Sequence, residues 1–344
     1  MLPAQEELPK LKVGIDARKL EVSGIGTYLR FLISGMLSTK NCEVTLFGDP
    51  QVIDSFFPGV HSERFTYGTN NPFAYLVLRQ NPLLKNFSFF LAPHYVGVHK
   101  LTIPLVLVLH DFIHLTHPSS MIHPIVAKRL LKCAIGGASH LIAVSKSTRK
   151  EAEILFPDSP PISVLTPPLK VVNSEVHSAK SHILCVVSND KSHKGIEDLM
   201  KVWESLIDPP ELVIAGVGSE NLKGKFPGAR GRVSQTELDQ LYRGASLVVI
   251  PSLAEGFGYV MAESHSYGVP VIARPVPALL EQRTKYDFFA RDFTLPAFRD
   301  VIMFAFQSKT PEEAFLELRD SALALSPDRF AESLTSLLSE IHSV

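Results

Sequence analysis

The stretch PSLAEGFGYVMAE at residues 251–263 holds the residues with the clearest chemical use. It follows an apolar run at 247–250, so we predict a strand, a glycine-containing turn and then a helix, whose first backbone N–H groups can bind a phosphate. Glu255 and Glu263 can accept hydrogen bonds from neighbouring hydroxyls. Together these groups suit a sugar nucleotide, with amides for the diphosphate and carboxylates for the sugar and the ribose. For either glutamate alone, a solvated side chain or an acid that complements the helix dipole is the simpler interpretation.

Two further glycine-containing segments can hold an anion at the start of a helix. Residues 187–195, VSNDKSHKG, follow an apolar run and bring Lys194, a point charge suited to phosphate, to a helix start. Residues 23–28, SGIGTY, bring two glycines to another helix start, where the backbone can approach a phosphate closely. This segment is not a dinucleotide fingerprint, because G-x-G-x-x-G requires a glycine where Leu29 stands. Judged alone, each segment can also be only a turn followed by an ordinary helix.

Histidines provide a third group of candidates. His110 ends the apolar run at 103–109, a position that faces the ligand crevice in open α/β sheets. A histidine there is more often a packed side chain than a catalyst. We predict no metal site at three later histidines, which have no cysteine or carboxylate cluster beside them: His114, His117 and His123.

The elements that must position these residues follow one pattern along the chain. Short apolar runs rich in β-branched residues alternate with helical patterns, which predicts an α/β fold with parallel sheets and helical crossovers. In the first half we predict strands at 12–15, 43–47, 105–109 and 140–144 and helices at 25–37 and 125–135. In the second half we predict strands at 183–187, 211–215, 247–250 and 269–273 and helices at 195–206, 236–243 and 259–266. A prolyl and polar stretch at 157–181 separates the two series, so a domain boundary is expected near residue 170.

The segment at 251–263 resembles the E-x7-E signature of retaining glycosyltransferases with the GT-B architecture, in particular glycosyltransferase family 4, the group 1 glycosyltransferases. The match extends to residues 233–245, which resemble the family's segment before PS-x-x-EGFG, and to GVPVI at 268–272, which resembles its G-x-PV-I continuation. The resemblance covers nearly the whole chain, most specifically residues 183–281. It implies two facing Rossmann-like doubly wound domains, with the crevice between them as the active site.

The same resemblance implies a domain plan. Residues 1–170 are the expected acceptor-side domain, and residues 171–326 are the expected nucleotide-sugar-binding domain. Residues 327–344 carry apolar side chains at helical spacing after Pro327, which predicts an amphipathic helix. The resemblance implies that this helix crosses back to the N-terminal domain.

Three residues are expected from the resemblance to be catalytic. Glu255 is expected to position the donor sugar, and His110 matches a histidine beside that sugar. Lys194 is expected to stabilise the charge that develops on the departing diphosphate. His94, in a PHY stretch that also resembles a family element, is a further candidate.

A larger set is expected to bind the donor through backbone amides, the lysine and the ribose-binding carboxylate. Its members are Gly24, Gly26, Asn189, Lys194, Gly256, Phe257, Gly258 and Glu263. Many family members carry Gly-Arg where this chain has Ser188-Asn189, so one cationic phosphate contact of the family is missing here.

The implied activity is retaining transfer of a hexose from a nucleotide diphosphate sugar to an acceptor hydroxyl, on a saccharide or a lipid-linked saccharide. A mannose- or rhamnose-type sugar is favoured, in the synthesis of surface polysaccharide or glycolipid. No D-x-D occurs in the sequence, so neither a metal nor another cofactor is expected. Two alternatives remain open: a non-hydrolysing sugar-nucleotide epimerase of the same architecture, and a non-catalytic protein that binds sugar nucleotides.

Composition disfavours several other classes of protein. With 34 Lys+Arg against 35 Asp+Glu the net charge is -1, so no nucleic-acid partner is expected. The three cysteines are scattered, and no apolar run approaches the roughly 20 residues of a membrane helix, so a cytoplasmic location is expected. Residues 1–170 carry a net charge of +5, from 17 Lys+Arg and 12 Asp+Glu. If the protein touches the inner face of a membrane, the expected contact is the basic segment KRLLK at 128–132.

Overall fold

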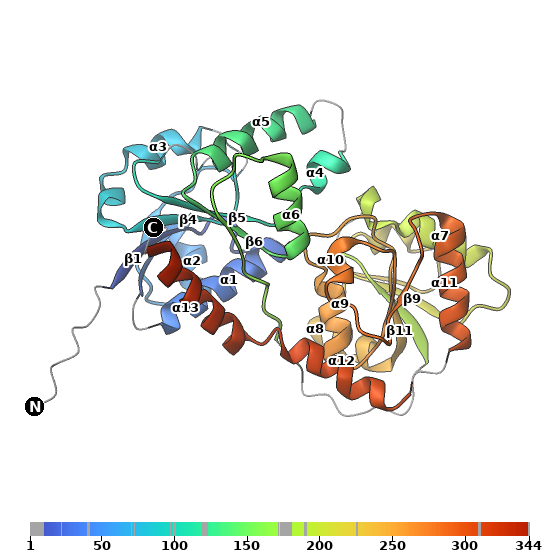
Figure 1. Cartoon of the computed structure of the whole chain (residues 1–344). Helices are drawn as coiled ribbons and strands as arrows, with labels where there is room; N and C mark the ends of the chain where they lie inside the picture. The colour runs from blue at the N-terminus through green and yellow to red at the C-terminus, as the bar shows by residue number, and fades with distance from the viewer. Residues whose placement is uncertain are drawn as a thin grey trace, which may run out of the picture. The chain divides into compact units, whose positions relative to one another are not determined.

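A computed structural model of the chain describes residues 10–342 except 22, 40, 41, 70, 72, 97, 99, 100, 119–122, 171, 173–180, 189, 190, 225, 309 and 310. The chain forms two compact α/β units, each built on its own sheet (Figure 1). One unit consists of the residues up to 168 together with those from 327 onward, and the other consists of residues 169–326.

The first unit is built on a seven-stranded sheet in which all paired strands are parallel. Its strands are β1 (Leu11–Asp16), β2 (Cys42–Gly48), β3 (Ser62–Arg64), β4 (Phe89–Ala92), β5 (Leu105–Leu109), β6 (His140–Ala143) and β7 (Ile162–Val164). The spatial order β3-β2-β1-β4-β5-β6-β7 reverses direction between β1 and β4. The carboxyl ends of strands at such a reversal point are where doubly wound sheets bind ligands.

Helices cover the two faces of this sheet. They are α1 (Ser23–Ser38), α2 (Pro50–Phe56), α3 (Ala74–Gln80), η1 (Pro82–Asn86), α4 (Ile113–Thr116), α5 (His123–Gly136), α6 (Lys146–Leu155) and α13 (Pro327–His342). Figure 1 shows α1 and α13 on one face and α3 and α5 on the other. The last helix, α13, packs closely on α1: a Cβ added at Gly35 would lie only 3.0 Å from Cδ2 of Leu334. The ring of Tyr28 also meets that of Phe330 edge to face, with centroids 6.0 Å apart.

The second unit is built on a six-stranded parallel sheet of the same type. Its strands are β8 (His182–Val186), β9 (Leu212–Ala215), β10 (Ala229–Gly231), β11 (Ala245–Ile250), β12 (Val271–Ala273) and β13 (Phe288–Phe289). The order β10-β9-β8-β11-β12-β13 reverses between β8 and β11. These two strands are hydrogen-bonded neighbours although the segments that follow them lie far apart in the sequence.

Alternate residues of the strands in the second unit enter different core clusters, so the sheet is buried on both faces. Cys185 of β8 packs in a cluster with Trp203, whereas its neighbour Leu184 packs in another with Met261. This explains the nearly continuous apolar runs of these strands. The helices of the unit are η2 (Ser192–Lys194), α7 (Ile196–Glu204), η3 (Ser219–Leu222), α8 (Gln235–Gly244), α9 (Tyr259–Ser266), α10 (Pro277–Leu280), α11 (Leu295–Gln307) and α12 (Glu313–Leu323).

The predicted α/β fold class with doubly wound parallel sheets is confirmed. Five strands are absent from the sequence predictions, namely β3, β4, β7, β10 and β13. All five are short, from two to four residues, and so present no run long enough to stand out. Strand β12 begins two residues later than the predicted range 269–273, because Pro270 has no N–H and the N–H of Val269 donates to the carbonyl of Ser264 instead.

Within the described ranges, no helix has both the length and the apolar character needed to cross a membrane.

Candidate functional site

Lys194 and Glu255 meet at the carboxyl ends of β8 and β11. The Nζ atom of Lys194 lies 2.7 Å from Oε1 of Glu255, and each side chain is 15% exposed. The hydroxyl of Ser252 donates to the same carboxylate oxygen at 2.7 Å. Because the two strands are neighbours at the reversal point of the sheet, their following loops share one edge. Both charged residues were expected at a ligand site, but their direct ion pair was not predicted.

The ion pair leaves capacity for a ligand on both partners. A lysine has three N–H donors, and Glu255 takes one of them. The other oxygen of Glu255, Oε2, accepts no hydrogen bond from the described residues. The pair can therefore bind an anionic group through the ammonium and a neighbouring hydroxyl through the carboxylate.

Two glycines shape the loops that carry the pair. Gly195 and Gly258 have φ angles of 68° and 94° and directly precede α7 and α9. A Cβ at Gly195 would lie 2.2 Å from the carbonyl oxygen of Pro251, so a larger residue would push the two loops apart. No side chain caps the N-terminus of α9, and the N-terminus of a helix is a position at which backbone N–H groups can bind an anion. Phe257, just before Gly258, is buried, and its carbonyl accepts a hydrogen bond of 2.6 Å from Gln282.

Arg274 is a residue of this site that the sequence reasoning missed. Its side chain is fully buried and donates to the carbonyl of Pro251 at 3.1 Å and to Asp198 at 2.8 Å. The guanidinium thus ties the loop after β11 to the first turn of α7, directly behind Gly195. The available signal was an arginine immediately after the apolar run at 269–273, at the carboxyl edge of the predicted sheet.

Glu263 lies on α9, and one of its two carboxylate oxygens accepts a hydrogen bond from another side chain. The hydroxyl of Tyr242 donates to its Oε2 at 2.8 Å, and its other oxygen accepts no hydrogen bond from the described residues. Burial raises the pKa of Glu263; the hydrogen bond from Tyr242 opposes this effect and the Asp239 carboxylate adds to it. Tyr242 is itself fixed by stacking on Tyr267, with ring centroids 4.9 Å apart. One carboxylate oxygen therefore remains for a ligand hydroxyl.

In the first unit, His110 follows β5 and His94 follows β4. Burial lowers the pKa of His110 to about 4, although the Asp111 carboxylate opposes the shift. Burial, together with the charges of Lys19 and Arg18, lowers the pKa of His94 to about 3. Both imidazoles are therefore neutral at neutral pH.

Gly24 and Gly26 lie in the first turn of α1, the helix that follows β1. A Cβ at Gly26 would lie 2.6 Å from the carbonyl oxygen of Leu20 and 2.7 Å from that of Lys19. Only glycine fits there, because the loop after β1 lies directly on the start of α1. Gly24 is exposed, so its backbone is open to solvent.

The predicted site residues fall into two groups. Glu255 and Lys194 lie together in the second unit with the turn residues Gly256, Phe257 and Gly258, and Glu263 lies on the helix that follows. Gly24, Gly26 and His110 belong to the first unit. Asn189 lies outside the described residues. No group of three or more His, Cys, Asp or Glu side chains that could hold a metal occurs in the described part of the chain.

Comparison with known proteins finds a family model and curated relatives that are similar to parts of the chain. Residues 170–290 match the family model described as "Glycosyl transferases group 1". The chain is 27% identical to the O-antigen chain mannosyltransferase RfbU of Salmonella typhimurium over 200 residues, which cover 53% of this chain and 56% of that protein. It is 37% identical to an uncharacterized glycosyltransferase of Methanocaldococcus jannaschii, MJ1607, over 101 residues, or 26% of each protein. The matched region thus spans about half of one curated relative and a quarter of the other.

Solved structures resemble the chain over nearly its whole length. Sucrose-phosphate synthase from Thermosynechococcus elongatus has a TM-score of 0.79 at 16% identity, covering 97% of this chain and 100% of that one. HepE of Anabaena in complex with UDP-glucose has a TM-score of 0.71 at 18% identity, covering 96% and 100%. The lipopolysaccharide outer core galactosyltransferase WaaB has a TM-score of 0.70 at 13% identity, covering 96% and 99%. The chain therefore has the α/β fold of GT-B glycosyltransferase structures, with parallel sheets of seven and six strands.

We expect Arg274→Met to destabilise the second unit by about 3 kcal/mol or more, because it leaves Asp198 and the Pro251 carbonyl without their buried partner. Urea unfolding measures this loss. The matched control is Arg283→Met, which removes an exposed guanidinium from the same unit and should change the free energy of unfolding by less than about 0.5 kcal/mol. Equal losses in the two variants would show that Arg274 does not tie the loops together.

Proposed function

We propose that the chain is a retaining glycosyltransferase that moves a hexose from a nucleotide diphosphate sugar to an acceptor hydroxyl. The observation that carries this proposal is the ion pair of Lys194 and Glu255 at the reversal point of the second sheet. It offers a cation for the diphosphate and a free carboxylate oxygen for a sugar hydroxyl. The match to the group 1 model over residues 170–290, which contain both side chains, supports the proposal. So does the similarity in fold to HepE, which was solved with UDP-glucose.

The proposed chemistry is displacement of the diphosphate from the anomeric carbon of the donor sugar. Lys194 and the N–H groups at the start of α9 would stabilise the negative charge that develops on the departing diphosphate as that bond breaks. The acceptor oxygen bonds to the anomeric carbon on the same face, and its proton passes to an oxygen of the leaving phosphate. Glu255 would position the sugar, and Glu263 would hold the ribose through its unused oxygen. We expect no metal ion to be required, because the ammonium and the amides supply the positive potential.

We further propose a mannose- or rhamnose-type donor and an acceptor in surface polysaccharide or glycolipid synthesis. Similarity to a protein named as an O-antigen chain mannosyltransferase supports this choice. The acceptor would be a saccharide or a lipid-linked saccharide.

Lys194→Ala should weaken the binding of GDP or UDP by about 1.5 to 3 kcal/mol, because it removes a charge-assisted hydrogen bond to phosphate. Calorimetry on the folded variant measures the change. Lys201→Ala, which removes an exposed lysine from α7, is the control and should bind as the unmodified protein does. Unchanged affinity in Lys194→Ala would remove this lysine from the donor site.

The activity itself is tested by incubating the protein with GDP-, dTDP-, UDP- and ADP-sugars, with and without saccharide acceptors and with EDTA. We expect transfer that persists in EDTA and yields a product with the anomeric configuration of the donor, as NMR would report. Inversion, or activity that EDTA abolishes and Mg²⁺ restores, would contradict the mechanism. Interconversion of the donor without an acceptor would favour the epimerase, and binding without turnover would favour the non-catalytic protein.

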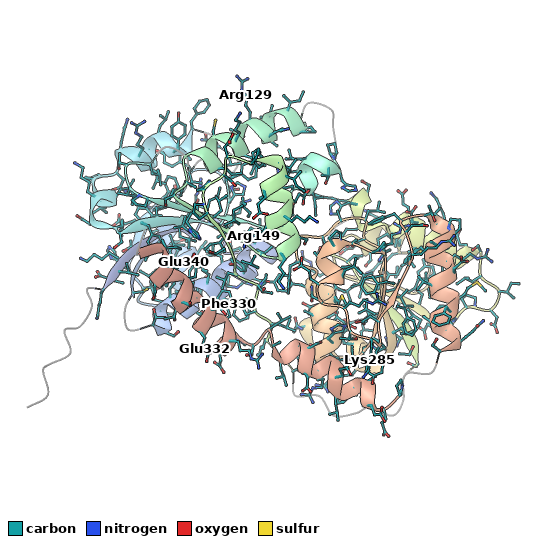
Figure 2. All side chains as sticks on the ribbon, viewed as in Figure 1. Arg129, Arg149, Lys285, Phe330, Glu332 and Glu340 are labelled. Carbon is teal, nitrogen blue, oxygen red and sulfur yellow. The ribbon has the colours of Figure 1, made fainter. Side chains whose placement is uncertain are left out.

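We also propose that the first unit meets an anionic membrane surface through the outer sides of α3 and α5. Both helices pack into the same core cluster on one face of the sheet, so their exposed sides point away from that face together (Figure 1). Large apolar side chains are exposed there, led by Phe73 at 67% and Ile125 at 68%. Figure 2 shows Arg129 projecting outward from α5. The other exposed members of this apolar-basic face are Leu76, Val77, Arg79, Val126, Lys128 and Lys132.

The charge around this face supports a lipid partner. Residues 65–150 contain nine Lys and Arg but one acidic residue, Asp111. Basic residues near an anionic membrane contribute about 1 kcal/mol each, and exposed apolar side chains add insertion into the headgroup region. Such a contact would bring the acceptor-side unit to a lipid-linked acceptor.

Reversal of charge at three positions of α5 should abolish sedimentation with phosphatidylglycerol vesicles at low salt, because about 3 kcal/mol of attraction is lost. The variant is Lys128→Glu, Arg129→Glu and Lys132→Glu combined. An equal change of charge in the second unit, at Lys201, Arg230 and Arg299, is the control and should leave sedimentation intact. If the two variants sediment alike, the apolar-basic face is not the membrane contact.

A further inference from the structure

Lys19, in the loop after β1, is a partly buried lysine that forms no ion pair with a described residue. The carboxylate whose charge acts on Lys19, that of Asp16, is already paired: Nε and Nη2 of Arg18 donate to its two oxygens at 2.9 and 2.7 Å, and these two side chains are 3–4% exposed. Among the described residues no hydrogen bond or ion pair holds the Lys19 ammonium, and burial lowers its pKa, with Asp16 opposing and Arg18 adding to the effect. A charge drawn out of water without a partner costs free energy that an anionic ligand would offset.

His94 presents a hydrogen-bond donor beside this lysine. Its Nδ1 accepts a hydrogen bond of 3.1 Å from the backbone N–H of Val96, so Nδ1 carries a lone pair. Since the ring is neutral at neutral pH, its one hydrogen lies on Nε2. No described residue accepts a hydrogen bond from that Nε2–H.

His110 presents a hydrogen-bond acceptor at the same edge of the sheet. Its ring is hydrogen-bonded to the carbonyl of Pro93, and its Nε2 is buried without a partner, so the bond to Pro93 is made by Nδ1–H. In the neutral ring Nε2 is therefore a bare acceptor. A buried acceptor with no donor is costly, and a hydroxyl of a ligand would satisfy it.

The three side chains gather at the reversal point of the first sheet. Strands β1, β4 and β5 are adjacent and parallel, with Ile15 level with Leu91 and Leu91 level with Val106. Lys19, His94 and His110 follow the carboxyl ends of these three strands in turn. The charge of Lys19 lowers the pKa of both histidines, as expected for groups that surround one point.

We propose that Lys19 and the Nε2–H of His94 form an anion subsite in the first unit, and that Nε2 of His110 accepts a hydroxyl of the same ligand. The ligand class is a hydroxylated anion, such as a sugar that carries a phosphate. The role of this subsite in sugar transfer rests on the proposed function, but the binding of the anion does not. The phosphate has two sources, a phosphorylated acceptor or the donor nucleotide.

The test is long-range ¹H–¹⁵N NMR of the full chain labelled on histidine, with His94 and His110 assigned from single substitutions. We expect the Nε2–H tautomer at His94 and the Nδ1–H tautomer at His110. Inorganic phosphate should shift the His94 nitrogens saturably. In Lys19→Met the phosphate should bind about tenfold or more weakly, as when a charge-assisted hydrogen bond is lost. Lys12→Met, which removes an exposed lysine from β1, is the control and should bind as tightly as the unmodified protein.

Further titrations identify the source of the anion. A hexose 6-phosphate that shifts both histidines at lower concentration than UDP or GDP would assign the subsite to a phosphorylated acceptor, and the reverse order would assign it to the donor. The proposal is overturned if none of these ligands shifts His94, if the tautomers are reversed, or if Lys19→Met binds phosphate as tightly as Lys12→Met. The titration is repeated in Lys194→Ala, in which phosphate should still shift the His94 nitrogens. The anion subsite is thereby tested separately from the donor site and from the transfer activity.

Discussion

The parallel pairing of β8 with β11 is the constraint on which the candidate site in the second unit depends. It places two loops from distant parts of the sequence at one edge of the sheet, and Lys194 meets Glu255 only because of it. The buried arginine behind these loops, Arg274, keeps that edge from opening. The site is therefore built on loops that strands and a buried arginine hold together, and both Lys194 and Glu255 keep hydrogen-bonding capacity that no described residue uses.

The first unit repeats this topology with a different distribution of charge. There the buried carboxylate of Asp16 is paired with Arg18, and the ammonium of the nearby Lys19 forms no ion pair with a described residue. In the second unit the lysine is instead paired with a carboxylate of the site itself. The same fold thus carries a partly buried lysine without an ion pair among the described residues at the edge of the first sheet. At the edge of the second sheet it carries a lysine that is paired with a carboxylate.

The sequence was sufficient for the fold class and for the loops that carry the candidate residues. Long apolar runs such as those of β5 and β11 are strong local signals, and Gly195 and Gly258 mark turns that few other residues can form. The pairing of Lys194 with Glu255 was not predictable in the same way, because the order of strands in a sheet is decided by packing. The roles of Arg274 and Lys19 were missed for the same reason, since a lone cation next to a strand reveals its importance only when its neighbours are known.

The return of α13 to the first unit means that the second unit is, in covalent terms, an insertion within the first. During synthesis the ribosome completes residues 169–326 before it makes the helix that packs on α1. The second unit can therefore fold as a contiguous domain, while the apolar surface of α1 beneath Phe330 and Leu334 stays uncovered until the end of translation. The first unit therefore completes its folding after the second unit, although its strands are translated first.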